Sequence, residues 1–457
     1  MEESNLSQAE LNDQISKADS KNISGILAKL FFIASVLFII LVLITLKSRF
    51  DYFNSDASIQ YHLIILMAYI VPSDSRRTPF YQTLRELYDN GTFSNGFRNA
   101  PESKRTDFLR FLTEYAIKEP LYPINHSCTQ KMEMRYKCSD FPSTFSGPRK
   151  SPARVAHLIQ FGFDTDVLEI HLNELYSVVD KFFIAESTRS HKFSTPKLLT
   201  WPIVSKQSRF KKFLDKVVYF NLTDEEMNKA GGGHDGIWRN EYAQERLRWE
   251  KFLKWNSDNN DYFTADDVVG FGDTDEIAYY QNVLLLKNCQ QNGKVDIGTW
   301  FTFGKINMRF RSDFPVRGNP FTYGDPTYYL LKDAMKEIPY PSRNRGRSPF
   351  FLLGGLHMTL YQYLPSVVIK TMTETESADS FELPYLFQMV AQNKTLFELE
   401  KGFSKYMQDK WASQRYVPLP QNKLGEPPYM LPWFLKCNLN RYSSFIHDQL
   451  PDRRLET

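Results

Sequence analysis

Apolar and polar residues follow two different periods along the part of the chain that begins near residue 151. Residues 155–163 have the continuous apolar character of a buried strand, and residues 181–186 repeat it. Between them, residues 166–179 are predicted to form an amphipathic helix with one apolar side, made of Leu168, Leu172, Leu175 and Val179. This alternation predicts an α/β domain, in which helices cover a sheet.

The alternation continues toward the C-terminus. We expect a helix followed by a strand over 210–220, a charged helix over 241–255, and strands at 267–271, 300–303 and 306–310. A segment rich in proline, arginine and serine at 339–349 is typical of a flexible loop. We therefore assign residues 151–445 to one α/β domain and residues 446–457 to a C-terminal tail.

Near the N-terminus, residues 30–46 carry no charge, and Lys29, Lys47 and Arg49 flank them. Seventeen helical residues span roughly 26 Å, which is enough for a thin bilayer, so we predict a transmembrane signal anchor. A cleaved signal peptide is the alternative, but no small-residue cleavage site follows and 29 mostly polar residues precede the segment. Residues 1–29 are then a cytoplasmic tail.

Cysteines and glycosylation sequons favour a lumenal body after this anchor, and hence a type II membrane protein. These residues are Cys128, Cys138, Cys289 and Cys437, and Asn90, Asn125, Asn221 and Asn393. Four cysteines allow three pairings. The short separation favours Cys128 with Cys138, which leaves Cys289 with Cys437.

Residues 47–150 form the predicted lumenal stem. Segments 85–88 and 108–115 have helix-like apolar spacing, so this stem or lid should be helical and pack on the main domain. With 56 Lys and Arg against 53 Asp and Glu, the net charge is +3 and the charges are interspersed. Nucleic acid is therefore excluded as the expected partner.

The main chemical signal is an acidic motif at the end of the predicted strand 267–271. Asp273 and Asp275 are two residues apart, so in a strand they share a face and can bind one Mn²⁺ or Mg²⁺. Glu276 adds a third acid, and three crowded acids repel one another unless a cation is present. Such an ion could bridge a nucleotide diphosphate. A solvated acidic turn is the alternative.

A second Asp-x-Asp, formed by Asp164 and Asp166, has a structural explanation. Asp166 lies three residues before Glu169 at the head of a helix, which is the spacing of a capping box.

A strand followed by Asp-x-Asp, as at Asp273 and Asp275, is also found in haloacid dehalogenase-type phosphatases, in which the first Asp is the nucleophile. That family has Thr or Val where this chain has Ile277, and a lumenal phosphatase remains an alternative.

Several blocks, taken in order, resemble glycosyltransferase family 17. They are Asp166 to Leu175, Val178 to Asp180 and Phe183 to Ser187; Pro196 to Leu199; Gly236 to Arg239 with Gln244 and Arg246; Asp266 to Val269 with Asp273 to Ile277; and Gly355 to His357 followed by Lys370. Ala278 and Leu356 depart from the family, which usually has Pro and Trp there.

This resemblance implies a GT-A-type, Rossmann-like domain that transfers GlcNAc from UDP-GlcNAc with inversion. The acceptor is then a mannose of a glycoprotein N-glycan, and the enzyme is a Golgi type II protein held in the membrane by one N-terminal helix. A catalytically silent glycan-binding relative is a further alternative.

The resemblance and the acidic motif together give the candidate site residues. We assign the metal to Asp273, Asp275 and His357. Donor contacts are assigned to Glu186, Arg239, Asp273, Asp275 and Lys370. Candidates for the general base that inversion needs are Glu276 and Glu241. His357 is as readily explained as a packed histidine, Arg239 and Lys370 as surface residues, and Glu186 as a loop cap.

Aromatic residues make up 15% of the chain. Those in the half that should face the acceptor include Trp238, Trp300, Tyr328 and Tyr329. They could stack on sugar rings, but filling of the core is the favoured interpretation for each one taken singly.

Overall fold

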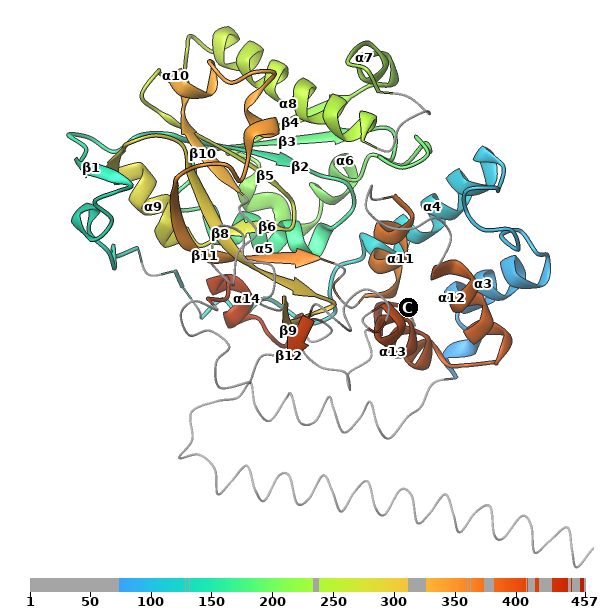
Figure 1. The fold of residues 1–457 in the computed structure, drawn as a ribbon. Helices are drawn as coiled ribbons and strands as arrows, with labels where there is room; N and C mark the ends of the chain where they lie inside the picture. The colour runs from blue at the N-terminus through green and yellow to red at the C-terminus, as the bar shows by residue number, and fades with distance from the viewer. Residues whose placement is uncertain are drawn as a thin grey trace, which may run out of the picture. The chain divides into compact units, whose positions relative to one another are not determined.

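A large mixed sheet forms the centre of the computed structural model (Figure 1). The structure describes residues 74–455 apart from short gaps and longer ones at 233–237, 311–325, 374–381, 410–429, where only 416–418 are described, and 446–452. The described residues belong to one compact unit. Four parallel strands lie in the order β5–β2–β3–β4, with bounds Val268–Asp273, Val155–Gln160, Lys181–Ser187 and Val217–Leu222.

Further strands extend the sheet beyond β5. The order continues through β10 (Thr327–Leu330), β8 (Val295–Phe303), β9 (Lys305–Phe310) and β12 (Tyr416–Pro418). β11 (Phe350–Thr359) pairs with β8 in parallel and with β6 (Glu276–Ala278) in antiparallel fashion. β1 (Phe145–Pro148) and β7 (Cys289–Gln291) form a separate pair.

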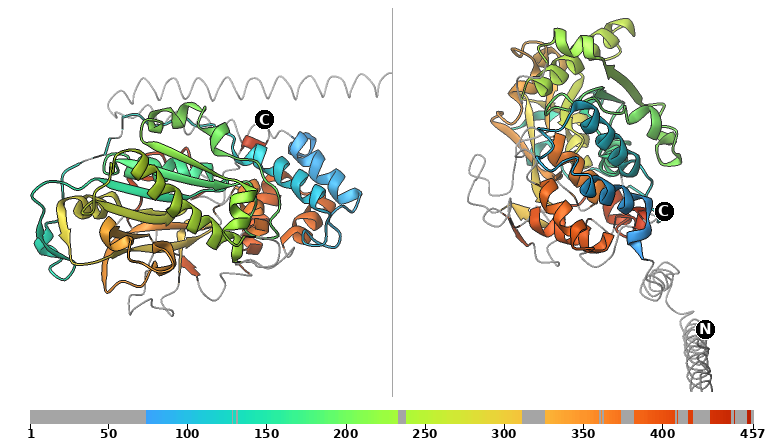
Figure 2. Two further views of the ribbon diagram at one scale, coloured as in Figure 1. Left: turned by 90° about the horizontal axis from the view of Figure 1, so that it is seen from above. Right: turned by 90° about the vertical axis from the view of Figure 1, so that its right-hand side faces the viewer.

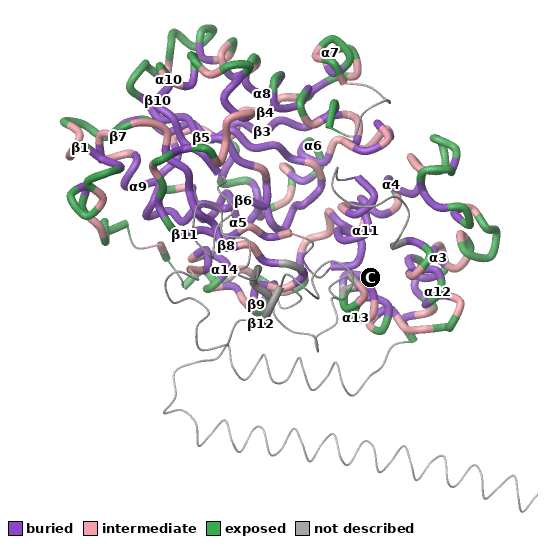
Figure 3. Tube along the Cα trace, in the orientation of Figure 1, coloured by how far each residue is buried: buried purple, intermediate pink, exposed green. Residues whose placement is uncertain are grey.

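The strands β2 and β3 are buried on both faces, as their continuous apolar sequences predict (Figure 3). Val155 and Ile159 of β2 pack with α5 (Thr165–Leu175) and α9 (Tyr280–Asn288) on one face. Ala156 and Leu158 pack with α8 (Arg239–Asp258) on the other. The predicted α/β class is therefore confirmed, with helices on both faces of a mixed sheet.

A group of helices from both ends of the described chain lies beside the sheet. α3 (Pro79–Asp89) and α4 (Glu102–Ala116) share one apolar cluster with α11 (Leu364–Thr373), α12 (Glu382–Ala391) and α13 (Leu396–Met407). The blue N-terminal and orange C-terminal helices lie side by side in both views of Figure 2. The two helices predicted before residue 150 are confirmed, and they pack on helices from beyond residue 360.

Short helices complete the described structure. They are α6 (Trp201–Val204), α7 (Asp224–Lys229), α10 (Leu331–Ala334) and α14 (Trp433–Cys437), with 3₁₀ turns η1 (Ser75–Arg77), η2 (Cys138–Asp140), η3 (Ser208–Phe213), η4 (Pro341–Asn344) and η8 (Arg453–Leu455). Among the described residues, no helix has both the length and the apolar character to cross a membrane. The anchor predicted at 30–46 lies outside the described residues.

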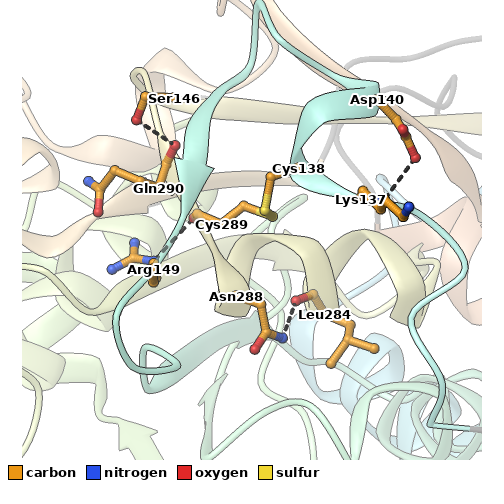
Figure 4. Close-up of a disulfide and its surroundings, with 9 residues drawn as sticks. All are labelled: Lys137, Cys138, Asp140, Ser146, Arg149, Leu284, Asn288, Cys289 and Gln290. Atoms are coloured by element: carbon orange, nitrogen blue, oxygen red, sulfur yellow. Dashed lines mark hydrogen bonds between the residues drawn. A yellow bond between two sulfur atoms is a disulfide. The ribbon is translucent and has the colours of Figure 1, made fainter.

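The disulfide pairing predicted from sequence separation is wrong. Cys138 bonds Cys289, 151 positions away in the chain (Figure 4). The pairing of β1 with β7 brings the η2 turn next to the end of α9, so strand pairing rather than local proximity selects the partner. Cys437 is also disulfide-bonded.

The capping box predicted at the head of α5 is also wrong. Asp164 is the N-cap residue, but its side chain makes no capping hydrogen bond. Asp166 and Glu169 are buried and face arginines instead: Arg209 donates to both, at 2.7 and 3.1 Å, and Arg454 donates to Asp166 at 2.7 Å. Burial of two carboxylates requires charged partners, and these arginines come from distant parts of the chain.

Two segments predicted to be loose are held by arginines. Arg454, in the predicted C-terminal tail, is buried against Asp166. The segment 339–349, predicted as a flexible loop, contains η4, and its Arg343 pairs with the buried Glu245 at 2.8 Å. Charge pairing therefore orders sequence that local composition marks as loop or tail.

Candidate functional site

The candidate site lies where the order of the strands reverses. From β2 the chain continues to β3 and β4 on one side, and then returns to place β5 on the other side of β2. In open parallel sheets, ligands bind at the carboxyl ends of the two strands that flank such a reversal. Here these ends are Gln160 and Asp273, which are register partners.

The acidic motif forms a turn at this position. β5 ends at Asp273, Thr274 and Asp275 form the turn, and β6 begins at Glu276. The Thr274 backbone N–H and hydroxyl both donate to the Gln160 carbonyl, at 3.2 and 2.7 Å. The expectation that both aspartates project from one strand is therefore wrong, because Asp275 belongs to a turn fixed to the neighbouring strand.

Asp275 is buried among basic groups. The Lys370 Nζ of α11 contacts its Oδ2, and the His357 Nε2 of β11 lies 3.5 Å from the same oxygen. Burial alone would raise the pKa of Asp275, but Lys370 and His357 outweigh it and hold this pKa well below the ordinary value. The structure therefore brings together three of the predicted site residues, Asp275, His357 and Lys370.

Asp273 faces a different pair of cations. Its Oδ2 lies 3.3 Å from Arg345, and its Oδ1 lies 3.9 Å from the fully buried Arg248. Burial would raise the pKa of Asp273, but the two guanidinium groups prevail and lower it. The Oδ1 atom is buried and accepts no hydrogen bond. It is therefore an acceptor available to a ligand.

Glu276, a candidate general base, makes hydrogen bonds within and beside the turn. Its Oε2 accepts hydrogen bonds from the Asp273 backbone N–H at 2.8 Å and from Arg345 at 2.7 Å. These contacts hold Arg345 beside Asp273. Glu276 therefore stabilises the turn in this structure, and its role as the general base stays a prediction.

Glu186, a predicted donor contact, makes its hydrogen bonds to other parts of the protein. Its carboxylate is fully buried and accepts from the backbone of Thr200 and Trp201, at 2.6 and 3.0 Å, and from Lys197 and Tyr219, at 2.9 and 3.1 Å. Both oxygens are used. These contacts are those of the alternative, a loop cap, and the assignment of Glu186 as a donor contact stays a prediction.

α8 carries the remaining predicted residues in its first turn. Arg239 is exposed and Glu241 is partly exposed, in contrast to the buried groups around Asp275. Their roles stay predictions. Among the aromatic candidates, Trp300, Tyr328 and Tyr329 are buried in the core, whereas Trp238 is 42% exposed and stacks beside Tyr242.

Sequence reasoning missed Arg248 and Arg345, and it gave Asp164 only a structural role. The Asp164 Oδ2 lies 3.9 Å from Lys370, and burial raises the Asp164 pKa to about 6, against the opposing effect of Lys370. Its position in the short loop between β2 and α5 was a usable signal, because this loop leaves the carboxyl end of a central strand. The two arginines gave no local signal, since only the tertiary fold brings them to Asp273.

Two buried histidines support the turn, His157 on β2 and His171 on α5. The Thr274 carbonyl can only accept, so the His171 Nδ1 donates to it at 2.9 Å. The His171 Nε2 then accepts from the His157 Nε2 at 2.9 Å, and Tyr328 donates to the His157 Nδ1 at 3.3 Å. Burial lowers the pKa of His157 well below its usual value and that of His171 to about 4. This neutral chain fixes the turn.

The chemistry of the donor set suits a hard divalent cation. Asp273 and Asp275 supply carboxylate oxygens, one of them a buried oxygen without a hydrogen bond, and His357 supplies an imidazole. As arranged, however, the described part of the chain contains no group of three acidic, histidine or cysteine side chains that could hold an ion. A bound ion would have to compete with Lys370 for Asp275.

Known proteins provide an independent comparison. Residues 100–297 match the model of glycosyltransferase family 17. Over 140 residues the chain is 29% identical to the β-1,4-mannosyl-glycoprotein 4-β-N-acetylglucosaminyltransferases of Rattus norvegicus and Homo sapiens. That stretch is 31% of this chain, and the chain spans about a quarter of each relative, 24% and 25% of their lengths.

Residues 100–297, which match the family model, contain the switch point, the acidic turn and the α5 helix that supports this turn. The relatives are named as N-acetylglucosaminyltransferases, so the comparisons favour the transferase interpretation over the phosphatase alternative. The resemblance to glycosyltransferase family 17 is thus confirmed for residues 100–297, and it supports a glycosyltransferase that uses a nucleotide-sugar donor.

Proposed function

We propose that this protein is a metal-dependent, inverting glycosyltransferase with a GT-A-type domain, which moves GlcNAc from UDP-GlcNAc to a mannose of a glycoprotein N-glycan. The transferred GlcNAc and the mannosyl-glycoprotein acceptor follow the name of the relatives, β-1,4-mannosyl-glycoprotein 4-β-N-acetylglucosaminyltransferase. UDP as the carrier and the N-glycan as the acceptor follow from the resemblance to the family. The proposed setting is the Golgi membrane, with a type II anchor at residues 30–46 and a lumenal catalytic domain.

One observation carries the proposal: the acidic turn lies at the carboxyl edge of the sheet, at the switch point, amid basic side chains. Asp273, Asp275 and His357 are the residues that would hold Mn²⁺ or Mg²⁺. A bound cation would neutralise negative charge on the donor diphosphate. Lys370 and Arg345 then supply positive charge beside the same phosphates, because each already lies next to one aspartate of the turn.

The other groups at the site orient these residues. Arg248 donates to the Gly272 carbonyl at 2.9 Å and to Ser342 at 3.2 Å, so it ties the end of β5 to η4. Preorganised charges of this kind stabilise a leaving phosphate without rearrangement during the reaction. Inversion further requires a base near the acceptor hydroxyl, and Glu276 and Glu241 are the proposed candidates.

The proposal is tested with purified full-length protein, Mn²⁺ and a panel of labelled UDP-sugars, first without and then with defined oligosaccharide acceptors. We expect slow hydrolysis of UDP-GlcNAc alone and transfer to a mannose-containing acceptor. Asp275→Asn should reduce both by at least a hundredfold, since a charged ligand and its hydrogen bonds are lost. The matched control is Asp266→Asn, an exposed aspartate paired with Lys332, which should retain activity.

Three results would contradict the proposal. Hydrolysis of a phosphate monoester without donor sugar would indicate the phosphatase alternative. Binding of glycans with no turnover of any UDP-sugar would indicate a silent relative. Full activity of Asp275→Asn would remove the acidic turn from the site.

A further inference from the structure

We propose that Trp238 and Tyr242, at the start of α8, form a stacking surface for a mannose ring of the acceptor glycan. Together with Arg343 of η4, these two side chains are called the aromatic platform below. The inference rests on the proposed function, and it adds to that function the residues that hold the acceptor.

Exposure separates the aromatic platform from the other aromatic candidates. Trp238 is 42% exposed and Tyr242 is 37% exposed, whereas Trp300, Tyr328 and Tyr329 are at most 2% exposed. The Trp238 and Tyr242 rings stack with their centroids 6.3 Å apart and their planes 23° apart. Four positions separate the two residues, so they share one side of the helix. Adjacent exposed rings form an apolar surface of the kind that marks a binding site.

Arg343 adds hydrogen-bond donors to this apolar surface. Its guanidinium carbon lies 3.8 Å from the centroid of the Tyr242 ring, which is a cation–π contact. The Arg343 side chain remains 31% exposed. A pyranose presents C–H groups on its faces and hydroxyl groups around its edge, so it needs a ring to stack on and polar groups beside that ring. The aromatic platform supplies both.

One buried carboxylate joins the aromatic platform to the acidic turn. Glu245 is 1% exposed; its Oε2 pairs with Arg343 at 2.8 Å, and its Oε1 lies 3.7 Å from Arg345. Arg345 in turn lies 3.3 Å from Asp273. Glu245 follows Tyr242 by three positions, so the same side of α8 carries both residues. A continuous set of contacts therefore leads from the exposed rings to the proposed donor site.

The start of α8 also lies at the edge of the sheet that carries the acidic turn. α8 connects β4 to β5, which run in the same direction, so the helix begins at the carboxyl edge of the sheet. In agreement, the Asn240 side chain donates to the His191 carbonyl at 2.9 Å, in the segment that follows β3. Glu241, a proposed candidate for the general base, belongs to the same turn of α8.

Exposure and charge favour the acceptor over the donor as the occupant. The acceptor glycan is attached to a protein, so the surface that holds its sugar has to be reached from solvent. A diphosphate is better compensated where the charged side chains are less exposed, as at Asp275 and Lys370, which are 11% and 14% exposed. Arg343 is already paired with Glu245. The aromatic platform therefore suits a neutral mannose ring.

Binding of mannotriose alone to the full-length protein, followed by ligand-observed NMR titration, provides the first test. Trp238→Ala and Tyr242→Ala should each weaken binding roughly tenfold, because each removes one ring of the surface. Trp238→Phe should stay within about threefold of wild type, since a ring remains. The matched control is Tyr88→Ala on α3: Tyr88 is 39% exposed and lies beside Arg85, and its removal should leave the affinity unchanged.

Steady-state kinetics then separate the acceptor from the donor. In Trp238→Ala the KM for a mannose-containing acceptor should rise roughly tenfold. The KM for UDP-GlcNAc and the slow hydrolysis of UDP-GlcNAc without acceptor should stay within about twofold of wild type. Because Trp238 is exposed, the midpoint of thermal unfolding should fall by less than about 2 °C, which shows that the variant is folded.

The remaining outcomes separate this inference from the proposed function. A higher KM for UDP-GlcNAc with an unchanged acceptor KM would assign the aromatic platform to the donor and overturn the inference. Unchanged acceptor binding and KM in Trp238→Ala would also overturn it, although the transferase can stand. Absence of mannotriose binding by wild type would refute the inference too. Binding of mannotriose that depends on Trp238, without turnover of any UDP-sugar, would support the aromatic platform and refute the transferase.

Discussion

Glu174 provides a sharp test of the electrostatics of the core. This residue near the end of α5 is fully buried. Its Oε1 accepts from the Tyr280 backbone N–H at 3.0 Å, and its Oε2 accepts from the Trp433 backbone N–H at 2.6 Å. Burial raises its pKa to about 8, although both hydrogen bonds act in the opposite direction. It joins the starts of α9 and α14 to α5.

The direction of the pH effect follows from proton linkage. The folded-state pKa of Glu174 lies above the ordinary value of 4.5, so its stabilising contribution is complete below about pH 4.5 and is lost as the pH rises through about 8. From about pH 6.5 to 8 the folded protein keeps a proton that the unfolded chain has released. Integration of the linkage relation over this window gives a loss of about 1.6 kcal/mol in the free energy of unfolding.

This window separates Glu174 from the other shifted groups of the core. The pKa of Asp164 is about 6, so Asp164 titrates chiefly below this window. The buried His157 and His171 act in the opposite direction, because the unfolded chain loses their protons near pH 6.5, and each adds about 0.4 kcal/mol of stability between pH 6.5 and 8. Urea unfolding of wild type at several pH values should show the loss. Glu174→Gln, which carries no titrating group at this position, should lack the loss, so the difference in stability between the two proteins should change by about 1.6 kcal/mol across the window, although its amide N–H₂ lowers stability by a constant amount. Parallel curves for the two proteins would refute the reasoning.

Two further predictions concern stability at neutral pH. Arg209→Met should lower the free energy of unfolding by about 3–5 kcal/mol, because it leaves the buried charge of Asp166 with one arginine in place of two. The control Lys254→Met, which breaks an exposed ion pair, should cost less than about 1 kcal/mol. Equal losses for the two variants would contradict this account. Cys138→Ser should cost about 2–5 kcal/mol through loss of the bond to Cys289, and the difference between wild type and variant in chemical unfolding should disappear when both proteins are reduced.

The sequence by itself determined the type and order of the main elements. Apolar runs at 155–163 and 181–186 became β2 and β3, and the spacing at 166–179 became α5. These patterns are local, since a strand buried on both faces or a helix with one apolar side shows its environment in the residues that form it. The acidic motif was also visible, because Asp273 and Asp275 are close in sequence.

Tertiary structure alone decided which charges meet. Lys370, Arg345 and Arg248 reach the acidic turn from α11, from the end of η4 and from α8, and strand pairing selected Cys289 as the partner of Cys138. Asp164 and Glu186 show the same division. Asp164 lies in the loop after β2 and Glu186 near the end of β3, and only their surroundings show that Asp164 has an oxygen without a hydrogen bond whereas both oxygens of Glu186 accept hydrogen bonds. Electrostatic partners are chosen by distance in space, and sequence separation carries little information about that distance.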